Sequence, residues 1–222
     1  MSVNFFQHIN VYCERTDASF WSEPLNAVSN LAFVIAAYFA YLAYRVHVET
    51  PQKTSLILIL CLVIIGMGSF AFHTFANRLT GLMDVLPIGI TILLFYGFTL
   101  INVFKMKWWL VLVAFAYFPL GYWGVSLPVF DDLGASAMYV PALLMLIGLA
   151  IIAVMKDIHS AHFLIMAFFI FTTSLLFRMA DEFVCAHFSY GTHYMWHILN
   201  AATLYLCLRF YMQGRLRDID DV

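Results

Sequence analysis

Long runs of apolar residues, separated by short polar breaks, make up most of the chain. A helix needs about 20 consecutive apolar residues to cross the hydrocarbon core of a bilayer, and the runs have about this length. The pattern therefore predicts an all-α, polytopic membrane protein, a bundle of seven transmembrane helices. The predicted spans cover about residues 26–46, 55–76, 84–103, 107–124, 137–155, 161–179 and 193–212.

The polar breaks between the spans are too short to hold a second domain, and no short-period repeat or low-complexity tract interrupts the pattern. We therefore expect a single domain over residues 1–222. It would consist of an extracytoplasmic N-terminal segment (1–25), a helical bundle (26–212) and a cytoplasmic tail (213–222). The first twenty residues lack a basic region followed by an apolar one, so we expect no cleavable signal peptide.

Lysine and arginine are unequally divided between the two sides of the predicted bundle, and cytoplasmic loops are enriched in both. One side holds Arg45, Lys53, Lys105, Lys107, Lys156, Arg209, Arg215 and Arg217. The other side holds only Arg15, Arg78 and Arg178. This division predicts an extracytoplasmic N-terminus and a cytoplasmic C-terminus.

The composition agrees with a membrane protein and excludes two other classes. Hydrophobic residues make up 64% of the chain and charged residues 11%, against roughly 25% charged in a soluble domain. The net charge is −2 and the cations are scattered, so no basic surface for nucleic acid is expected. The expected partners are membrane lipids.

Ionisable side chains within the spans gather near one membrane face, although each is costly there unless it faces a polar interior. Ser69 and His73 are four residues apart at the end of the second span. His193 and His197 are four apart at the start of the seventh, and residues four apart share one face of a helix. Asp84 opens the third span. The predicted topology brings all five to the extracytoplasmic side.

Three neutral imidazoles that converge on one point form an open zinc site, with a fourth position for water. The predicted ligands are His73, His193 and His197. Zinc lowers the pKa of bound water toward about 7 and polarises a carbonyl group. Asp84 is then the expected general base, and Ser69 the expected hydrogen-bond donor to the oxyanion.

Each of these residues also has a simpler interpretation. Ser69 alone is typical of a small residue that lets helices pack closely. A single histidine at the end of a span is typical of an interfacial group, and one HxxxH pair fixes only two ligands. The combination of SxxxH, a short turn, an acidic residue and HxxxH at one depth favours the metal site.

The order of these motifs resembles the alkaline ceramidases and the wider superfamily of seven-span metal-dependent hydrolases that also contains the adiponectin receptors. The resemblance extends over about residues 12 to 212. Its residues are Glu23 and Asn26, Ser69 and His73, Asp84, and His193 and His197. It implies that the histidines hold zinc, that the aspartate works with the bound water and that the serine assists at the substrate carbonyl. The implied reaction is hydrolysis of ceramide or a related N-acyl lipid, which enters from the bilayer, to a fatty acid and an amine such as sphingosine.

The resemblance also implies a calcium site, because ceramidases of this kind bind calcium in the N-terminal segment. Glu14 and Glu23 match acidic ligands there, and Asp17 could substitute for another. Val11 and Thr16 stand where further oxygen ligands are expected, and calcium prefers six to eight oxygens, which predicts a weak or empty site. Alternatively, Glu23 is a carboxylate in the first turn of a helix, where the helix dipole favours it.

Two other classes of function compete with hydrolysis. A heptahelical receptor, sensor or transporter could use the histidines for metal or ligand binding, or for proton relay, without turnover. Opposed histidines could also hold haem. Crowding of the histidines at one membrane face favours the zinc site over a proton pathway, which would distribute such groups across the bilayer.

The outer end of the sixth span carries Arg178, Asp181 and Glu182, and we expect Arg178 to pair with one of the acids. His187, on the same side, is a reserve metal ligand.

Two of the four cysteines are expected on the extracytoplasmic side. Cys13 lies in the N-terminal segment and Cys185 between the sixth and seventh spans, whereas Cys61 and Cys207 fall inside spans. Because disulfides form in oxidising compartments, we predict a bond between Cys13 and Cys185. The alternative is two unpaired thiols on one side, since sequence alone does not fix connectivity.

Overall fold

The computed structural model describes residues 4–48 and 51–220, without the side chains of 129, 130, 132 and 217–220. Apart from one antiparallel bridge between His8 and Asn77, the regular structure of the described residues is entirely helical, which confirms the all-α prediction. The elements are α1 (Pro24–Ser29), α2 (Leu31–His47), α3 (Lys53–Phe75), α4 (Arg78–Phe98), the π-helical turn η1 (Thr99–Val103), α5 (Trp108–Phe115), α6 (Tyr117–Val125), the 3₁₀ segment η2 (Pro128–Tyr139), α7 (Val140–Met155), α8 (Ala161–Val184) and α9 (His193–Asp220).

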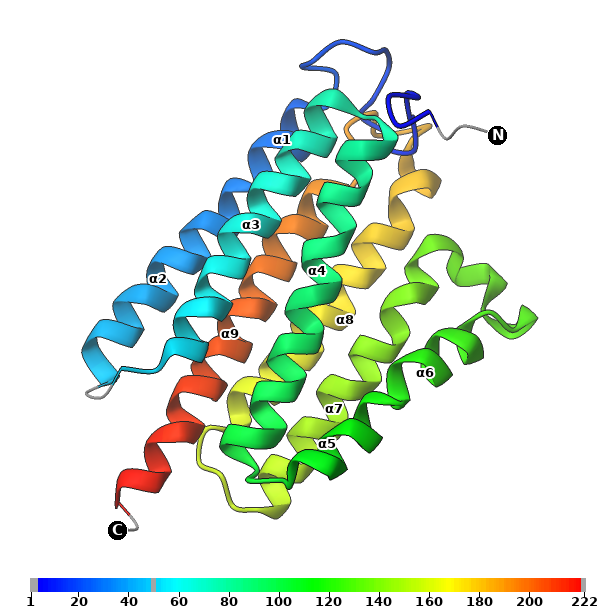
Figure 1. Cartoon of the computed structure of the whole chain (residues 1–222). Coiled ribbons are helices and arrows are strands. Elements are labelled where there is room, and N and C mark those ends of the chain that lie inside the picture. The colour runs from blue at the N-terminus through cyan, green and yellow to red at the C-terminus, as the bar shows by residue number, and fades with distance from the viewer. Residues whose placement is uncertain (1–3, 49–50, 221–222) are drawn as a thin grey trace.

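Six helical stretches are long and apolar enough to cross a membrane, as in an integral membrane protein (Figure 1). They are Pro24–His47, Lys53–Phe75, Arg78–Val103, Trp108–Val125, Leu133–Met155 and Ala161–Val184. The last helix, α9, is not among them and carries polar residues along its length, including Asn200 and Arg209. It nevertheless packs against α2, α3 and α8 inside the same bundle.

The stretch Trp108–Val125 agrees with the fourth predicted span but is broken within it, and α9 continues beyond the seventh predicted span. The fourth predicted span, 107–124, consists of two helices, α5 and α6, which meet at Ala116. Pro119 explains the break, because its ring clashes with the carbonyl of residue i−4, here Phe115. The predicted tail, 213–222, is helical as far as Asp220, because good helix formers such as Arg215 and Leu216 continue α9 beyond its apolar part.

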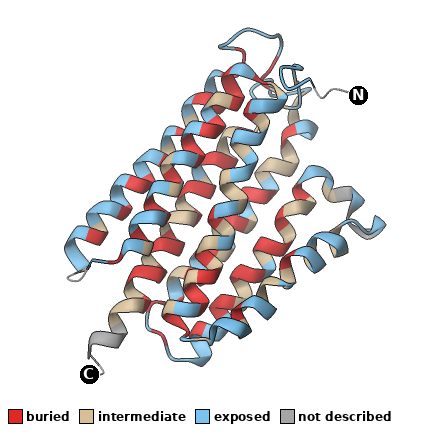
Figure 2. Cartoon of the chain, in the orientation of Figure 1, coloured by how far each residue is buried: buried red, intermediate tan, exposed pale blue. Residues whose placement is uncertain are grey.

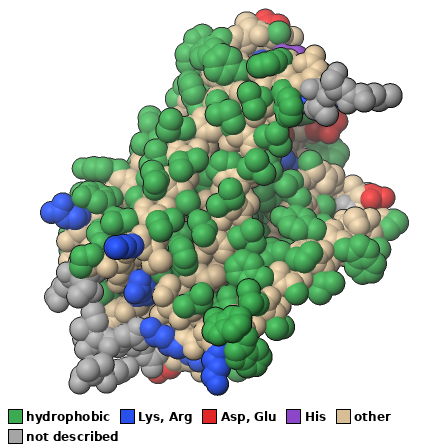
Figure 3. Space-filling view, viewed as in Figure 1, with side chains coloured by type: hydrophobic (Ala, Val, Ile, Leu, Met, Phe, Trp, Pro, Cys, Tyr) green, Lys and Arg blue, Asp and Glu red, His purple; other side chains and the backbone are tan. Residues whose placement is uncertain are grey.

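The helices bury one face and expose a second apolar face (Figure 2). In α3, Leu58, Leu62 and Ile65 are buried at helical spacing, whereas Leu60 and Ile64 are exposed. Hydrophobic side chains cover most of the visible outer surface (Figure 3). So large an exposed apolar surface is stable against lipid tails and not against water.

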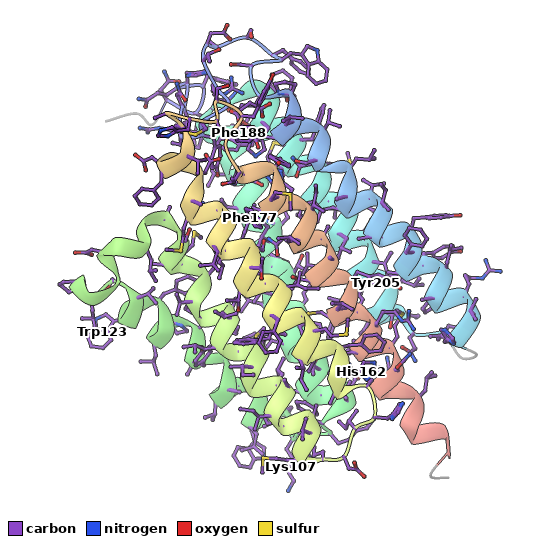
Figure 4. The ribbon with its side chains drawn as sticks, turned by 180° about the vertical axis from the view of Figure 1, so that it is seen from behind. Lys107, Trp123, His162, Phe177, Phe188 and Tyr205 are labelled. Carbon is purple, nitrogen blue, oxygen red and sulfur yellow. A yellow bond between two sulfur atoms is a disulfide. The ribbon has the colours of Figure 1, made fainter. Side chains whose placement is uncertain are left out.

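The two chain ends lie at opposite ends of the bundle (Figure 1). Lys and Arg side chains gather at the end with the C-terminus (Figure 3). From behind, Lys107 lies at this end and Phe188 at the other (Figure 4). The charge asymmetry predicted from the sequence is thus present in space.

The N-terminal segment, residues 4–23, folds across the opposite end of the bundle. The backbone N–H of Ile9 donates to the carbonyl of Ala76 at 2.7 Å, and that of Leu79 donates to the carbonyl of Phe5 at 3.0 Å. A disulfide joins Cys13 to Cys185, with their Cα atoms 5.3 Å apart, which confirms the predicted pairing. The segment is therefore fixed both to the α3–α4 turn and to the α8–α9 connection.

Candidate metal centre

A sharp turn brings the polar residues of α3 and α4 to the same end of the bundle. Ala76 ends α3 in the left-handed conformation, with φ 42°. Asn77 then caps α4: its side chain accepts from the N–H of Thr80 at 3.0 Å, and its own N–H donates to the Thr80 hydroxyl at 3.1 Å. Because of this turn, Ser69 and His73 near the end of α3 lie at the same depth as Asp84 near the start of α4.

The start of α9 is held by the carboxylate of Asp181 from α8. One oxygen accepts from the N–H groups of Thr192 and His193, at 2.7 and 2.9 Å, and the other accepts from the N–H of Cys13 at 3.1 Å. Gly191 has φ 63°, and any side chain there would collide with Asp181 and Cys13. This arrangement fixes the position from which His193 and His197 enter the bundle.

The three predicted ligand histidines come together at this end of the bundle. One ring nitrogen from each of His73, His193 and His197 lies within 4.8 Å of the others. The ring centroids are 4.6 to 5.2 Å apart, and the exposed fractions are 0%, 1% and 2%. Such proximity of buried imidazoles supplies the donors of a three-histidine metal site.

The remaining contacts of these rings fit a metal. The Nδ1 of His73 contacts a carboxylate oxygen of Glu23 at 2.6 Å, and the Nδ1 of His197 contacts the Ser29 hydroxyl at 2.7 Å. Oxygen partners on the outer nitrogen are typical of metal-bound histidines, because they fix the tautomer and the ring orientation. The Nε2 of His73 and the Nδ1 of His193 are buried without a hydrogen-bond partner among the described residues, and an unpaired buried nitrogen is costly unless something binds it.

Asp84, the predicted general base, lies close enough to His73 for their charges to interact. Its carboxylate interacts electrostatically with His73, Ser69 and Arg178. Gly68, next to Ser69, lies directly against the carbonyl of Met83, next to Asp84. The close approach of α3 and α4 at this glycine sets the distance between the two predicted catalytic side chains.

Tyr12 of the N-terminal segment covers the histidines. Its ring stacks on that of His193, with centroids 3.7 Å apart, and lies 5.2 Å from that of His73. Burial raises the pKa of Tyr12 well above its usual value, against the opposing effect of Arg178, so its hydroxyl stays protonated at neutral pH. The lid over the site is thus an aromatic ring with a neutral polar group.

The three candidate calcium ligands do not converge. The two carboxylate oxygens of Glu14 accept from the N–H groups of Leu25 and Asn26 at the start of α1, at 2.7 and 2.8 Å. Asp17 is exposed and accepts from the N–H of Ser19. Glu23 contacts His73 and pairs with Arg15. Since N–H groups occupy oxygens that calcium would need, nothing in the described residues supports the calcium prediction.

The pKa shifts of these carboxylates follow from their contacts. Burial raises the pKa of Glu14, although the N–H groups of Asn26 and Leu25 oppose the shift. The hydrogen bond from Ser19 lowers the pKa of Asp17. Burial acts to raise the pKa of Glu23, but its hydrogen bonds with His73 and Arg15 outweigh burial and leave it below its usual value. Glu23 is therefore charged at neutral pH.

The expected ion pair of Arg178 with Asp181 or Glu182 is wrong within the part of the chain that the structure describes. Asp181 binds backbone N–H groups, and Arg178 donates to the hydroxyl of Ser136 at 2.9 Å. The Arg178 guanidinium also lies over the rings of Tyr139 and Trp196, at 5.4 and 5.6 Å from their centroids. The positive charge of Arg178 therefore lies at the edge of the site, against the faces of two aromatic rings.

His187, the reserve ligand, is exposed and outside the histidine cluster.

Four residues that contact the site were not predicted. Tyr12, Arg15 and Ser29 contact the histidines. Tyr139 contacts Arg178. The role of Ser29 could have been predicted from the sequence, because Ser29 lies one turn after Asn26 in a stretch of small polar residues. Tyr12 and Arg15 lie in irregular chain, where no spacing rule indicates contacts.

An apolar cavity lies inside the bundle, one helical turn from the polar site. Ile65 precedes Ser69 by one turn in α3, and Asn200 follows His197 by nearly one turn in α9; Ile65 and Asn200 both line the cavity. Phe95 and other apolar side chains form most of the remaining wall. The cavity therefore begins about one helical turn from the histidines and lies on the side of them that faces the C-terminal end of the bundle.

Comparison with known proteins found no matching family model and no matching curated protein.

Proposed function

We propose that this chain is a zinc-dependent amidohydrolase of the alkaline ceramidase kind, which cleaves ceramide or a related N-acyl lipid to a fatty acid and an amine such as sphingosine. The observation that carries the proposal is the cluster of three buried histidines, with unpaired ring nitrogens, about one helical turn from an apolar cavity. A metal site close to an apolar interior suits an amide bond that joins a polar head to a hydrocarbon chain.

The residues around the histidines supply the remaining chemistry. Zinc, held by His73, His193 and His197, would make a water molecule acidic enough to attack at neutral pH and would polarise the amide carbonyl. Asp84 accepts the proton of the attacking water and returns it to the leaving nitrogen, which departs as the amine. Ser69 donates a hydrogen bond to the carbonyl oxygen as negative charge builds on it.

The cavity supports a lipid substrate. Its walls are mostly apolar, as an acyl chain extending from the site into the bundle would require. The volume of the cavity is about 50 Å³, so an acyl chain would have to displace side chains of the wall as it enters. A groove on the outer surface, between α4 and the α6–η2 region, shares Ile88, Ile92 and Tyr139 with the cavity. A lipid could therefore enter from the bilayer between these elements without passing through water.

We further propose that the chain crosses the membrane seven times, with the site on the extracytoplasmic side. Chain ends at opposite ends of the bundle require an odd number of crossings, and α9 packs among the six apolar stretches. The gathering of Lys and Arg at the C-terminal end supports a cytoplasmic C-terminus. The Cys13–Cys185 disulfide at the other end supports an oxidising compartment there.

The test combines metal analysis with a substrate screen on protein purified in detergent. We expect one zinc per chain and release of fatty acid from ceramides or other N-acyl lipids. His197→Ala should remove zinc and activity together. His162→Ala is the matched control, because His162 is exposed and lies toward the other end of the bundle (Figure 4).

The outcomes separate the two parts of the proposal. Full zinc occupancy in the His197→Ala protein would contradict the ligand assignment. Stoichiometric zinc in the wild type without fatty acid release from any N-acyl lipid would favour a metal-binding receptor or transporter. A visible haem spectrum in the pure protein would contradict the zinc site itself.

A further inference from the structure

The guanidinium of Arg15 is buried at the end of the bundle that carries the histidines. Its side chain is 0% exposed, although it belongs to the surface segment that covers the bundle end. A buried arginine is strongly destabilising unless a partner charge and several acceptors surround it. Arg15 has both, and together they tie it to one of the proposed zinc ligands.

Four oxygens surround the guanidinium. Its Nε pairs with a carboxylate oxygen of Glu23. Its terminal nitrogens donate to the backbone carbonyls of Asp17 at 3.1 Å, Ser19 at 3.4 Å and His73 at 2.9 Å. Carboxylate and carbonyl oxygens are also the ligand types that calcium binds, but calcium needs six to eight of them and the guanidinium uses four.

Arg15 holds His73 at two points. The carbonyl of His73 lies in the last turn of α3, where helix carbonyls lack intrahelical partners and a cation is favoured by the helix dipole. The second carboxylate oxygen of Glu23 contacts the Nδ1 of His73 at 2.6 Å. The guanidinium thus fixes the backbone of His73 directly, and its ring through Glu23.

We propose that Arg15 is a positioning residue that serves as the resident cation of the N-terminal segment, in place of calcium, and orients His73 for metal binding. Because its four acceptors are already engaged, added calcium finds no oxygen shell. Metal affinity and stability are therefore independent of calcium. This inference rests on the metal part of the proposed function and not on hydrolysis.

The experiment measures Co²⁺ binding, because the visible absorption of Co²⁺ reports ligand geometry as well as affinity. Wild type, Arg15→Ala and Arg15→Lys are titrated with Co²⁺ in calcium-depleted buffer and again with added calcium. Arg78→Ala is the matched control, since Arg78 is an exposed arginine at the same end of the bundle. Thermal unfolding of each protein is followed in parallel.

Wild type and Arg78→Ala should bind Co²⁺ equally, with or without calcium. Arg15→Ala should bind Co²⁺ about 10- to 100-fold more weakly, the scale for losing an outer partner of a metal ligand. Millimolar guanidinium should restore part of this affinity and the wild-type spectrum, which a merely structural defect would not allow. Arg15→Lys should lie between the two, because one ammonium cannot reach all four oxygens.

Three results would overturn the proposal. The first is an Arg15→Ala protein with wild-type Co²⁺ affinity and spectrum. The second is a wild type whose Co²⁺ affinity or unfolding temperature rises when calcium is added. The third, decisive even if Arg15→Ala does not fold, is an Arg15→Lys protein identical to wild type. A wild type that binds no Co²⁺ would instead contradict the metal site, and one that binds Co²⁺ but hydrolyses nothing would leave the role of Arg15 intact.

Discussion

Substitution of Gly68 by alanine tests whether the approach of α3 to α4 sets the geometry of the site. Gly68 has no side chain, and a Cβ atom there would overlap the backbone carbonyl of Met83. A carbonyl oxygen in a helix backbone cannot move aside alone. The Cβ would lie 2.0 Å from the carbonyl oxygen, and contacts shorter than 3.0 Å are essentially never seen, so the two helices would have to separate by at least about 1 Å. Ser69 and Asp84, the neighbours of these two residues, would move apart with them.

The change in unfolding free energy caused by Gly68→Ala follows from two opposing effects. Overpacking of this kind costs about 1 to 3 kcal/mol. Replacing glycine by alanine within a helix gains about 0.5 to 1 kcal/mol from backbone entropy. Gly148 of α7 is the matched control, because nothing lies within 4 Å of a Cβ atom at that position. The difference between Gly68→Ala and Gly148→Ala therefore isolates the steric cost.

The assays are thermal unfolding in detergent and turnover of whichever N-acyl lipid the screen identifies. Gly68→Ala should unfold at a lower temperature than Gly148→Ala. Its turnover should fall about 100-fold, the scale for a displacement of about 1 Å between reacting groups. Gly148→Ala should keep wild-type turnover. Equal unfolding temperatures for the two variants, with turnover intact in Gly68→Ala, would refute the reasoning.

Four further predictions concern three single side chains of the site and the disulfide. Asp84→Asn should abolish turnover while elemental analysis still finds zinc, and near-normal turnover would contradict the role of Asp84 as base. Ser69→Ala should lower turnover roughly 100-fold, the scale for one oxyanion donor. Glu23→Gln should weaken zinc binding about 10- to 100-fold in a competition titration with a chromophoric chelator, and unchanged affinity would rule out its orienting role. Replacing Cys13 and Cys185 together by serine should lower the unfolding temperature, with about 5 kcal/mol as the upper limit from the chain-entropy model; an unchanged temperature would show that the membrane alone confines the segment.

Helical spacing explains why the histidine cluster was predictable. Two residues four apart on a helix share a face whatever surrounds the helix, so SxxxH and HxxxH fix two pairs of side chains in advance. The short turn after His73 then brings Asp84 to the same depth. Only the distance between the two pairs required the structure, and it lies within reach of one metal ion.

Contacts made by the irregular N-terminal segment could not be predicted in the same way. Nothing in the spacing of Tyr12 or Arg15 indicates which helix each one meets, because their positions depend on the disulfide and on bonds to the α3–α4 turn. Glu23 was identified as a calcium ligand by resemblance, but its partners are Arg15 and His73. The sequence shows which charged residues the segment carries, but not which of them form pairs.

The route of the chain through the site also sets the order in which the site can form during synthesis. Arg15 and Glu23 emerge first, whereas His193 and His197 arrive with the last helix, and the disulfide joins residues 172 positions apart. At typical ribosomal rates, the N-terminal segment waits roughly 10 to 35 s for its partners. A chain that stops before Cys185 therefore lacks two of the three histidines and the disulfide that holds the N-terminal segment across them. Metal binding by a newly made chain would then report completed insertion of every helix.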